Sequence, residues 1–536
     1  MEAVRHTDVL IIGAGPSGLM MAAQLLRYGI QPTIIDAKSG PDRETKATLV
    51  HARSMELFRQ LGLSDHLLAK GLSLYAVQLF GRKAEIGTLD FSQLLATDTV
   101  FPFIERVGQD SMERLLLNRL TERACPVAWE TRLDSLRLDD GGATVTLVHG
   151  GERQAWRCAW LIGADGQHSS VREQLNIPLE GDGRVRNFFA ADVETDQADA
   201  RKIKLILYDN GPLAVVPSGV ADRYRIIGQL PGAHNSPQGS TLRYTDIKKE
   251  VRAALGVDLP GAQYLRITPF SYRKMVAEQV RRQRCFLLGD AAHGVLPTVS
   301  RGMNEGLYDA ANLAWKLAGV VNGRMAPNVL DTYQQERMPA IKADGGIFEL
   351  GEKGWIWRGL LDRVGLLRRI SRIDTDPAGL RRAFDRLSGL DVDYRRSPLS
   401  VHHASGGQIQ AGDRLPCLSV YDEKSKTHTD LHRWCEKPGF VLLVLGTISH
   451  HHLNIIGQWM RQKYPREMHL YYLPYSDRNQ QVFQAFEVKT SNTKIVLIRP
   501  DMYIAYINDM LNVSLIDTYM EEILGWAGFG HLPEKH

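Results

Sequence analysis

Three short segments of the chain place glycines directly after an apolar run, and two of them add an aspartate. They read IIGAGPSG at 11–18, LIGADGQHSSVR at 161–172 and FLLGDAAHG at 286–294. Glycines let a backbone approach a ligand closely, and free N–H groups at the start of a following helix favour phosphate. Aspartate accepts hydrogen bonds from hydroxyl groups. These residue types predict a ligand that carries both phosphates and hydroxyls.

The first segment predicts a buried strand at 9–12, a tight turn, a helix at 19–28 and a second strand. The turn has the G-x-G-x-x-G spacing of dinucleotide-binding sites, with Gly13, Gly15 and Gly18. Asp36 ends the second strand, where a carboxylate can bind the hydroxyls of an adenosine ribose and would repel a 2′-phosphate. The segment therefore suits FAD or NAD rather than NADP. The alternative is a glycine turn that holds no ligand.

The two later segments each follow an apolar strand. The second has D-G-x-x-S-x-x-R spacing from Asp165 to Arg172, although such a stretch alone is more often a plain strand–turn–helix connection. In the third, Gly289 and Asp290 end a strand, and the alanines that follow leave room for a polyhydroxyl chain such as ribityl. The first segment would hold the ADP half of a long ligand and Asp290 its ribityl half. FAD has both halves.

In this order and spacing, the three segments resemble the aromatic-hydroxylase class of single-component FAD monooxygenases, over roughly residues 5–345. The third segment extends through LLGDAAHGVLPTVSRGMNEGLYDAANLAWKL for this comparison. The resemblance implies an α/β fold, α+β in parts, with a Rossmann-like FAD-binding domain and an inserted antiparallel-sheet substrate domain. It implies flavin contacts by Arg53 and Gln109, and a role for Asp165 in bridging cofactor and pyridine nucleotide. It also implies contacts along the isoalloxazine by Pro297, Gly302, Met303 and Asn304.

The loop after Pro297 departs from the family pattern. Val299 and Ser300 stand where many members have a glycine pair, which puts close approach of this backbone to the flavin in doubt. Arg301 either favours an anionic reduced flavin or is exposed. The structural alternatives for Arg53 and Gln109 are a solvated helix arginine and a surface helix cap.

The pattern along the chain predicts four parts. The FAD-binding domain takes 1–180 and 281–345, with part of 75–110 on the substrate side, and alternating strands at 181–280 form a substrate-binding sheet. Residues 346–405 are a helical connection, whose basic amphipathic pattern at 353–373 suits packing on the parent domain or a second subunit better than a membrane surface. Residues 406–536 resemble the thioredoxin-like C-terminal domain of phenol-hydroxylase-type members, without the CxxC.

Composition excludes several function classes. The 65 Lys and Arg residues nearly balance the 61 Asp and Glu residues, so no strong field points to nucleic acid or an anionic membrane. The five scattered cysteines favour a reducing cytoplasm over a disulfide framework or a zinc site, and the histidines of SHHH at 449–452 are expected in a solvated loop. Neither a cleavable signal nor an apolar run of ~18 residues occurs. We expect a cytoplasmic protein without metal or stable membrane insertion.

These observations predict an enzyme in which NADPH or NADH reduces bound FAD and O2 adds to the reduced flavin at C4a. The resulting hydroperoxide would hydroxylate a phenolic or other small aromatic substrate. Because no second Rossmann unit is present, the pyridine nucleotide should bind transiently beside the flavin. Two alternatives stay open: a polyketide-tailoring or antibiotic-inactivating hydroxylase of polycyclic substrates, and a flavin-binding module that does not oxygenate. The sequence assigns no catalytic base, and a homodimer is compatible with it.

Overall fold

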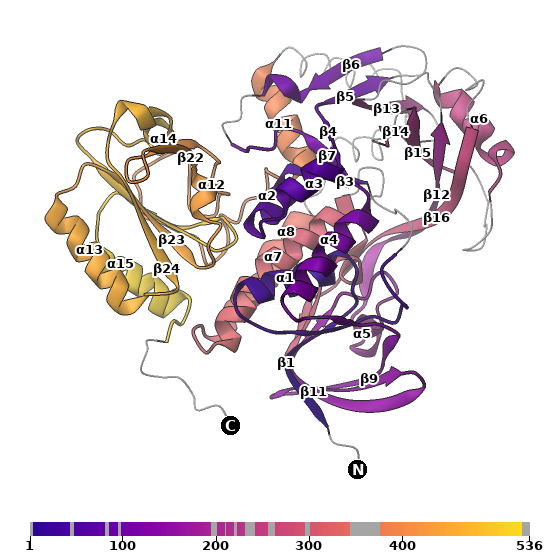
Figure 1. The fold of residues 1–536 in the computed structure, drawn as a ribbon, viewed down its shortest axis with the longest axis horizontal. Coiled ribbons are helices and arrows are strands. Elements are labelled where there is room, and N and C mark those ends of the chain that lie inside the picture. The colour runs from indigo at the N-terminus through magenta and orange to yellow at the C-terminus, as the bar shows by residue number, and fades with distance from the viewer. Residues whose placement is uncertain are drawn as a thin grey trace.

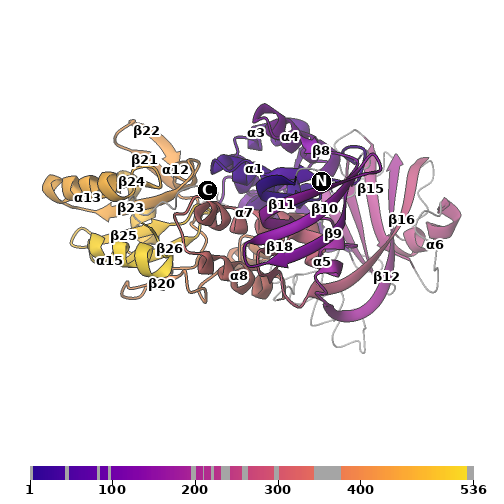
Figure 2. The ribbon, with the colours of Figure 1, turned by 90° about the horizontal axis from the view of Figure 1, so that it is seen from below.

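The computed structural model describes residues 4–42, 48–80, 85–94, 98–194, 201–208, 211–218, 222–230, 242–255, 263–294, 301–342 and 376–527. Its large sheets lie in a row, with the half of the chain that is predicted to bind FAD, called the FAD-binding half below, between a mainly antiparallel sheet and a C-terminal unit (Figures 1 and 2). The pattern at 353–373 and the loop residues Pro297, Val299 and Ser300 lie outside the described residues.

The central sheet brings together strands from distant parts of the chain. Its order is β17 (Arg281–Arg282), β18 (Cys285–Leu287), β11 (Glu152–Gly163), β1 (Arg5–Ile12), β2 (Thr33–Ile35) and β8 (Val127–Ala128), and β10 (Gly142–His149) and β9 (Thr131–Asp139) extend it from β11. β1 is parallel to both β2 and β11, and β11 is parallel to β18. Parallel strands end at the same edge, so the three glycine-containing turns lie together.

Helices cover this central sheet and complete the FAD-binding half. They are α1 (Pro16–Arg27), α2 (Ala52–Gln60), α3 (Ser64–Lys70), α4 (Gln109–Glu122), α5 (Ser170–Gln174), α7 (Arg301–Val321) and α8 (Asp331–Lys342). α1 packs against α7, and α1 begins at Pro16 because proline fits the first helical turn, three residues before the predicted start. A small sheet of β3 (Leu49–Val50), β7 (Ile104–Arg106) and β4 (Leu72–Leu74) lies beside them.

The second large sheet is built mainly from the middle of the chain. Its order is β19 (His293–Gly294), β16 (Gln263–Ala277), β12 (Leu179–Glu194), β15 (Arg223–Gln229), β14 (Gly211–Pro217), β13 (Lys202–Tyr208), β5 (Ala76–Phe80) and β6 (Glu85–Asp90). All neighbours are antiparallel except β13 and β5. α6 (Tyr244–Leu255) packs on one face, where Phe189 and Val193 meet Ile247 and Val251. The other face joins the core of the FAD-binding half.

The C-terminal unit has the sheet order β20 (Val401–His402), β26 (Ile504–Asn508), β25 (Thr493–Ile498), β23 (Phe440–Gly446) and β24 (Met468–Leu473). β23 and β24 are parallel and joined through α13 (His450–Lys463), whereas β25 is antiparallel to β23 and to β26. Toward the C-terminus the other elements are α11 (Pro377–Ser388), α12 (Leu431–Trp434), α14 (Gln480–Ala485), α15 (Val513–Thr518), β21 (Ser419–Asp422), β22 (Thr427–Asp430) and a π-helical turn at Tyr519–Ile523. Along the whole described chain, 3₁₀ turns occur at Phe91–Gln93, Gly289–Ala291, Pro327–Leu330 and Asp477–Asn479.

The prediction of a loop at residues 449–452 was wrong. The side chain of Ser449 accepts a hydrogen bond from the His452 backbone N–H and caps α13, so the three histidines form its exposed first turn. Among the described residues, no group of His, Cys, Asp or Glu side chains has an arrangement suited to a metal ion. None of the helices in the described ranges is both long and apolar enough to cross a membrane.

Candidate cofactor site

In the first turn, Gly13 and Gly18 have no room for a side chain, whereas Gly15 faces open space. Gly13 has φ +105°, and a Cβ there would lie 2.3 Å from the Ala164 carbonyl oxygen. A Cβ on Gly18 would lie 2.0 Å from the carbonyl oxygen of Gly13. A Cβ on Gly15 would meet no protein atom within 4 Å. Gly13 and Gly18 therefore close the turn, whereas Gly15 leaves open space above it.

That open space lies at the N-terminus of α1. Gly15 is the N-cap and no side chain caps the helix, so the positive end of the helix dipole is available to an anion. Asp36, which follows β2, accepts hydrogen bonds from the backbone N–H groups of Ala14 (2.7 Å) and Lys38 (2.8 Å). The same carboxylate keeps further acceptor capacity. This cradle fits the diphosphate and ribose of a dinucleotide.

The second turn is held by its own side chains. Asp165 accepts hydrogen bonds from the hydroxyls of Ser169 (2.5 Å) and Ser170 (2.9 Å), and Ser169 caps α5 by accepting from the Arg172 N–H. The buried Arg172 guanidinium donates to the carbonyl oxygen of Ala291 at 3.0 Å. The D-G-x-x-S-x-x-R spacing thus ties the second turn to the third.

The third turn touches the first directly. Gly289 has φ +57°, and a Cβ there would lie 2.3 Å from the Ser17 hydroxyl oxygen at the start of α1. A Cβ on Gly306 of α7 would lie 2.1 Å from the same oxygen. Asp290, the next residue, is exposed. The first and third turns therefore lie side by side, and the predicted ligand contacts of Asp290 stay a prediction.

The start of α7 closes the site on another side. The buried Asn304 accepts hydrogen bonds from the His51 N–H (2.9 Å) and the Ser54 hydroxyl (2.6 Å). Gly302 and Met303, in the same first turn, are half-buried. Arg301 is not free in solvent, because its guanidinium donates to Glu305 at 3.1 Å. The predicted flavin contacts of this turn stay predictions.

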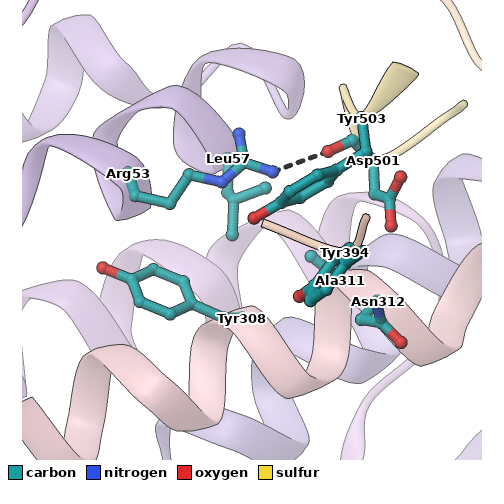
Figure 3. A pocket seen from close by; sticks show the side chains of 8 residues that line it. All are labelled: Arg53, Leu57, Tyr308, Ala311, Asn312, Tyr394, Asp501 and Tyr503. Carbon is teal, nitrogen blue, oxygen red and sulfur yellow. Dashed lines mark hydrogen bonds between the residues drawn. The ribbon is translucent and has the colours of Figure 1, made fainter. Parts of the chain in front are cut away.

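Gln109 and Arg53 lie in buried settings that differ from both of their structural alternatives. Gln109, the first residue of α4, donates to Glu113 at 2.8 Å, and burial raises the pKa of that carboxyl. Arg53 donates to the Asp501 carbonyl oxygen at 2.6 Å (Figure 3). It also donates to Glu56 at 3.0 Å. Its guanidinium is thus directed toward the C-terminal unit, and its predicted flavin contact stays a prediction.

The space beside Arg53 is a small cavity at the boundary with the C-terminal unit. Its lining comes from α2, α7 and the C-terminal unit: Arg53, Leu57, Tyr308, Ala311, Asn312, Tyr394, Asp501 and Tyr503 (Figure 3). The cavity has room for about one water molecule. It is too small for an aromatic substrate.

Glu105 on β7 is a buried carboxyl near Gln109. It accepts a hydrogen bond from the Ser73 hydroxyl at 2.7 Å, while its Oε1 is buried without a partner, and burial raises its pKa to about 7. Between pH 4.5 and 7 the unfolded chain would lose this proton and the folded protein would keep it, so wild-type stability falls as pH rises. We expect Glu105→Gln to gain about 1–3 kcal/mol relative to wild type across this window.

The measurement is urea unfolding of wild type and Glu105→Gln at several pH values from 4 to 8. The exposed Glu85, on β6 of the second large sheet, provides the control, since the stability difference between Glu85→Gln and wild type should not change with pH. If the stability difference between Glu105→Gln and wild type also did not change with pH, the Glu105 carboxyl would have the same pKa in the folded and unfolded states.

Comparison with known proteins decides the family. A sequence profile described as an FAD binding domain matches residues 6–344. The chain belongs to this family of FAD-binding proteins. Pentachlorophenol 4-monooxygenase of Sphingobium chlorophenolicum is 31% identical over 421 residues, which cover 76% of this chain and 75% of that protein. 6-Methylpretetramide 4-monooxygenase of Streptomyces rimosus is 32% identical over 336 residues, which are 62% of this chain. The aligned residues span 59% of the length of that relative.

Among solved structures, the anhydrotetracycline hydroxylase OxyS from Streptomyces rimosus is similar over 97% of this chain and 99% of its own, with 26% identity and a TM-score of 0.76. The mixed α/β fold, the cofactor FAD and the class of FAD-dependent monooxygenase predicted from the sequence are therefore confirmed. The sequence pattern does not single out Ser17 and Gly306, which pack at the contact between the first and third turns. Gly306 begins the GLYDAANLAWKL stretch of the third segment.

Proposed function

We propose that this protein is a single-component monooxygenase that uses FAD, O2 and NADPH or NADH to hydroxylate an aromatic small molecule. The observation that carries the proposal is the convergence of the three glycine-containing turns at one edge of the central sheet. Ligands of open α/β sheets bind at the carboxyl ends of the strands. Bound FAD would supply the redox chemistry: electrons from NADPH or NADH would allow one atom of O2 to enter the substrate while the other leaves as water.

The residues of this chain hold and orient the cofactor. The α1 N-terminus binds the diphosphate over Gly15, Asp36 binds the adenosine ribose, and Asp290 binds the ribityl hydroxyls. The N-terminal turn of α7, from Gly302 to Asn304, would contact the isoalloxazine, and its helix dipole would favour negative charge there. Arg53 and Gln109 complete the flavin contacts, and Asp165 bridges the cofactor and pyridine-nucleotide sites.

The substrate lies between the flavin and the second large sheet. In our division the FAD-binding domain is 1–180 and 281–345, and the substrate domain is 181–280 with β5 and β6 added to its sheet. The face of this sheet opposite α6 carries Phe188 and Phe270, whose rings stack with centroids 5.7 Å apart. Phe188 is buried and Phe270 is half-buried, so the pair forms part of an aromatic wall, which suits an aromatic substrate.

A polycyclic substrate is the second candidate for the same chemistry. The stacked Phe188–Phe270 pair lies on a sheet of eight strands, which gives a broad face for a flat, fused ring system. Two of the similar proteins are named for polycyclic compounds, a 6-methylpretetramide monooxygenase and an anhydrotetracycline hydroxylase. A single-ring phenol remains the first candidate, in line with the pentachlorophenol monooxygenase.

The C-terminal unit consists of residues 406–536, which in our division are a thioredoxin-like domain without redox function, and of the segment just before them, which includes Tyr394 and β20. The order β24-β23-β25-β26, with a parallel β–α–β unit followed by an antiparallel hairpin, supports this assignment. Burial raises the pKa of the Cys435 thiol to about 12, which keeps it from forming a reactive thiolate. The domain serves packing on the FAD-binding domain, and dimerisation is its second candidate role.

The test starts with the visible spectrum of the purified protein, followed by NADPH and NADH oxidation with a panel of phenols and fused-ring aromatics. We expect a yellow protein whose oxidation rate rises with a compound that gains one oxygen atom. Acceleration only by fused-ring compounds would favour the polycyclic candidate. Bound FAD that no pyridine nucleotide reduces with any compound would overturn the monooxygenase proposal in favour of a flavin-binding module.

A further inference from the structure

A buried carboxylate on α7 holds the third turn from behind. Asp309 Oδ2 accepts a hydrogen bond from the Gly289 N–H at 3.0 Å and contacts His293 Nε2 at 2.7 Å. Gly289 and His293 lie on either side of Asp290, so both ends of the turn are fixed to one oxygen. Gly289 is in the left-handed conformation, with φ +57°, and packs against Ser17 and Gly306. The turn therefore has little freedom to take another shape.

The Asp309 carboxylate is kept ionised by its surroundings. Its second oxygen, Oδ1, accepts from Nε of the buried Arg337 at 2.7 Å. His293 and Arg337 lower the pKa of Asp309 to about 2 against the opposing effect of burial, and the pKa of His293 is raised by Asp309, Glu305 and Asp290 against its own burial. A fully buried carboxylate with three donors in fixed directions is a rigid anchor.

From this geometry we propose that Asp309 is a positioning residue for FAD: it holds the Gly289–Ala291 turn in the form that presents Asp290 to the ribityl chain. The inference rests on the proposed function, in which Asp290 binds that chain. Asp309 itself faces the protein interior, since its side chain has no exposed surface. It acts on the cofactor only through the turn.

The matched pair for the test is Asp309→Asn and Glu336→Gln. Each replaces a fully buried, ion-paired carboxylate by an amide of the same shape, and Glu336 of α8 contacts Lys316 and Arg499 rather than the turn. FAD affinity is measured on the full-length apoprotein by flavin fluorescence, and unfolding is measured in parallel. We expect Asp309→Asn to raise the Kd for FAD about 10- to 100-fold, the factor that one lost hydrogen bond to a charged group represents. Glu336→Gln should lower stability without this change in Kd.

A double-mutant cycle distinguishes positioning from general destabilisation. If Asp309 acts through Asp290, the effect of Asp309→Asn on Kd should shrink to less than threefold in an Asp290→Asn background, whereas independent effects would multiply. Should Asp309→Asn fail to fold, His293→Leu removes one of the two contacts to Oδ2 and leaves the Arg337 pair intact. It should raise the Kd by about tenfold, again with coupling to Asp290→Asn.

The experiments distinguish the positioning role of Asp309 from the proposed ribityl contact of Asp290, on which it rests. Retention of FAD with unchanged affinity by Asp290→Ala would overturn the ribityl assignment itself. Weak binding by Asp290→Ala together with wild-type affinity in Asp309→Asn, or multiplicative effects in the cycle, would overturn the positioning role alone.

Discussion

Gly15→Ala is expected to abolish retention of FAD in a protein that folds as stably as the wild-type apoprotein. The added methyl group meets no protein atom within 4 Å, and Gly15 does not have the positive φ that would strain an alanine. Its stability should therefore change by less than ~0.5 kcal/mol. The methyl would occupy the space in which the diphosphate approaches the α1 N-terminus, so we expect the Kd for FAD to rise at least about 100-fold.

Two other glycines serve as controls for Gly15. Gly40 likewise has no atom within 4 Å of an added Cβ and no positive φ, and Gly40→Ala should change neither stability nor affinity. In Gly18→Ala the methyl would lie 2.0 Å from the Gly13 carbonyl oxygen, so this variant should lower the free energy of unfolding of the apoprotein itself. Both quantities follow from flavin fluorescence and urea unfolding of the apoprotein. Wild-type FAD affinity in Gly15→Ala would contradict a diphosphate site at this turn.

Glu336→Ala is expected to destabilise the protein by about 3–5 kcal/mol, the usual cost of removing one partner from a buried ion pair. Glu336 accepts hydrogen bonds from Arg499 (2.6 Å) in the C-terminal unit and from Lys316 (2.7 Å) on α7, and all three side chains are fully buried. The two cations hold the pKa of Glu336 well below its ordinary value. The alanine variant would leave a buried guanidinium with one anionic partner fewer.

Urea unfolding at pH 7 measures the loss, with Glu180→Ala as the control. Glu180 pairs with Lys342 at 3.3 Å, but both side chains are more than half exposed, so its removal should cost less than ~1 kcal/mol. Because the folded-state pKa of Glu336 is depressed, its contribution is present above the unfolded pKa of about 4.5 and lost as pH falls below it. Equal losses in the two alanine variants would mean that the buried network does not join the two units.

The strand–turn–helix units could be predicted from sequence because each is local. The spacing of Gly13, Gly15 and Gly18 and the aspartate after β2 depend on contacts within about thirty residues, and these elements are present where expected. Asp309 could not be assigned in this way. Its role depends on Gly289, His293 and Arg337, which the chain brings together only through tertiary packing.

The contacts of Arg53 also could not be predicted from local sequence. The family resemblance implies a flavin contact for Arg53, and the alternative is a solvated helix arginine. Its partners in the structure include a carbonyl oxygen 448 residues later in the chain. No local pattern carries that information, since it depends on how the C-terminal unit docks against α2. The histidines at 450–452 were misassigned for a smaller reason: a single serine cap decides whether they start a helix.

The central sheet is completed by a strand that lies far along the chain from the others. β18 pairs with β11 through residues 285–287, and β11 pairs with β1 through residues 5–12. During synthesis, the first glycine turn leaves the ribosome long before Gly289, Asp290 and α7 exist to pack against Ser17. Until these later residues emerge, the edge of β11 that pairs with β18 and the α1 surface that packs against α7 lack their native partners. This part of the sheet can therefore close only after more than half of the polypeptide has been made.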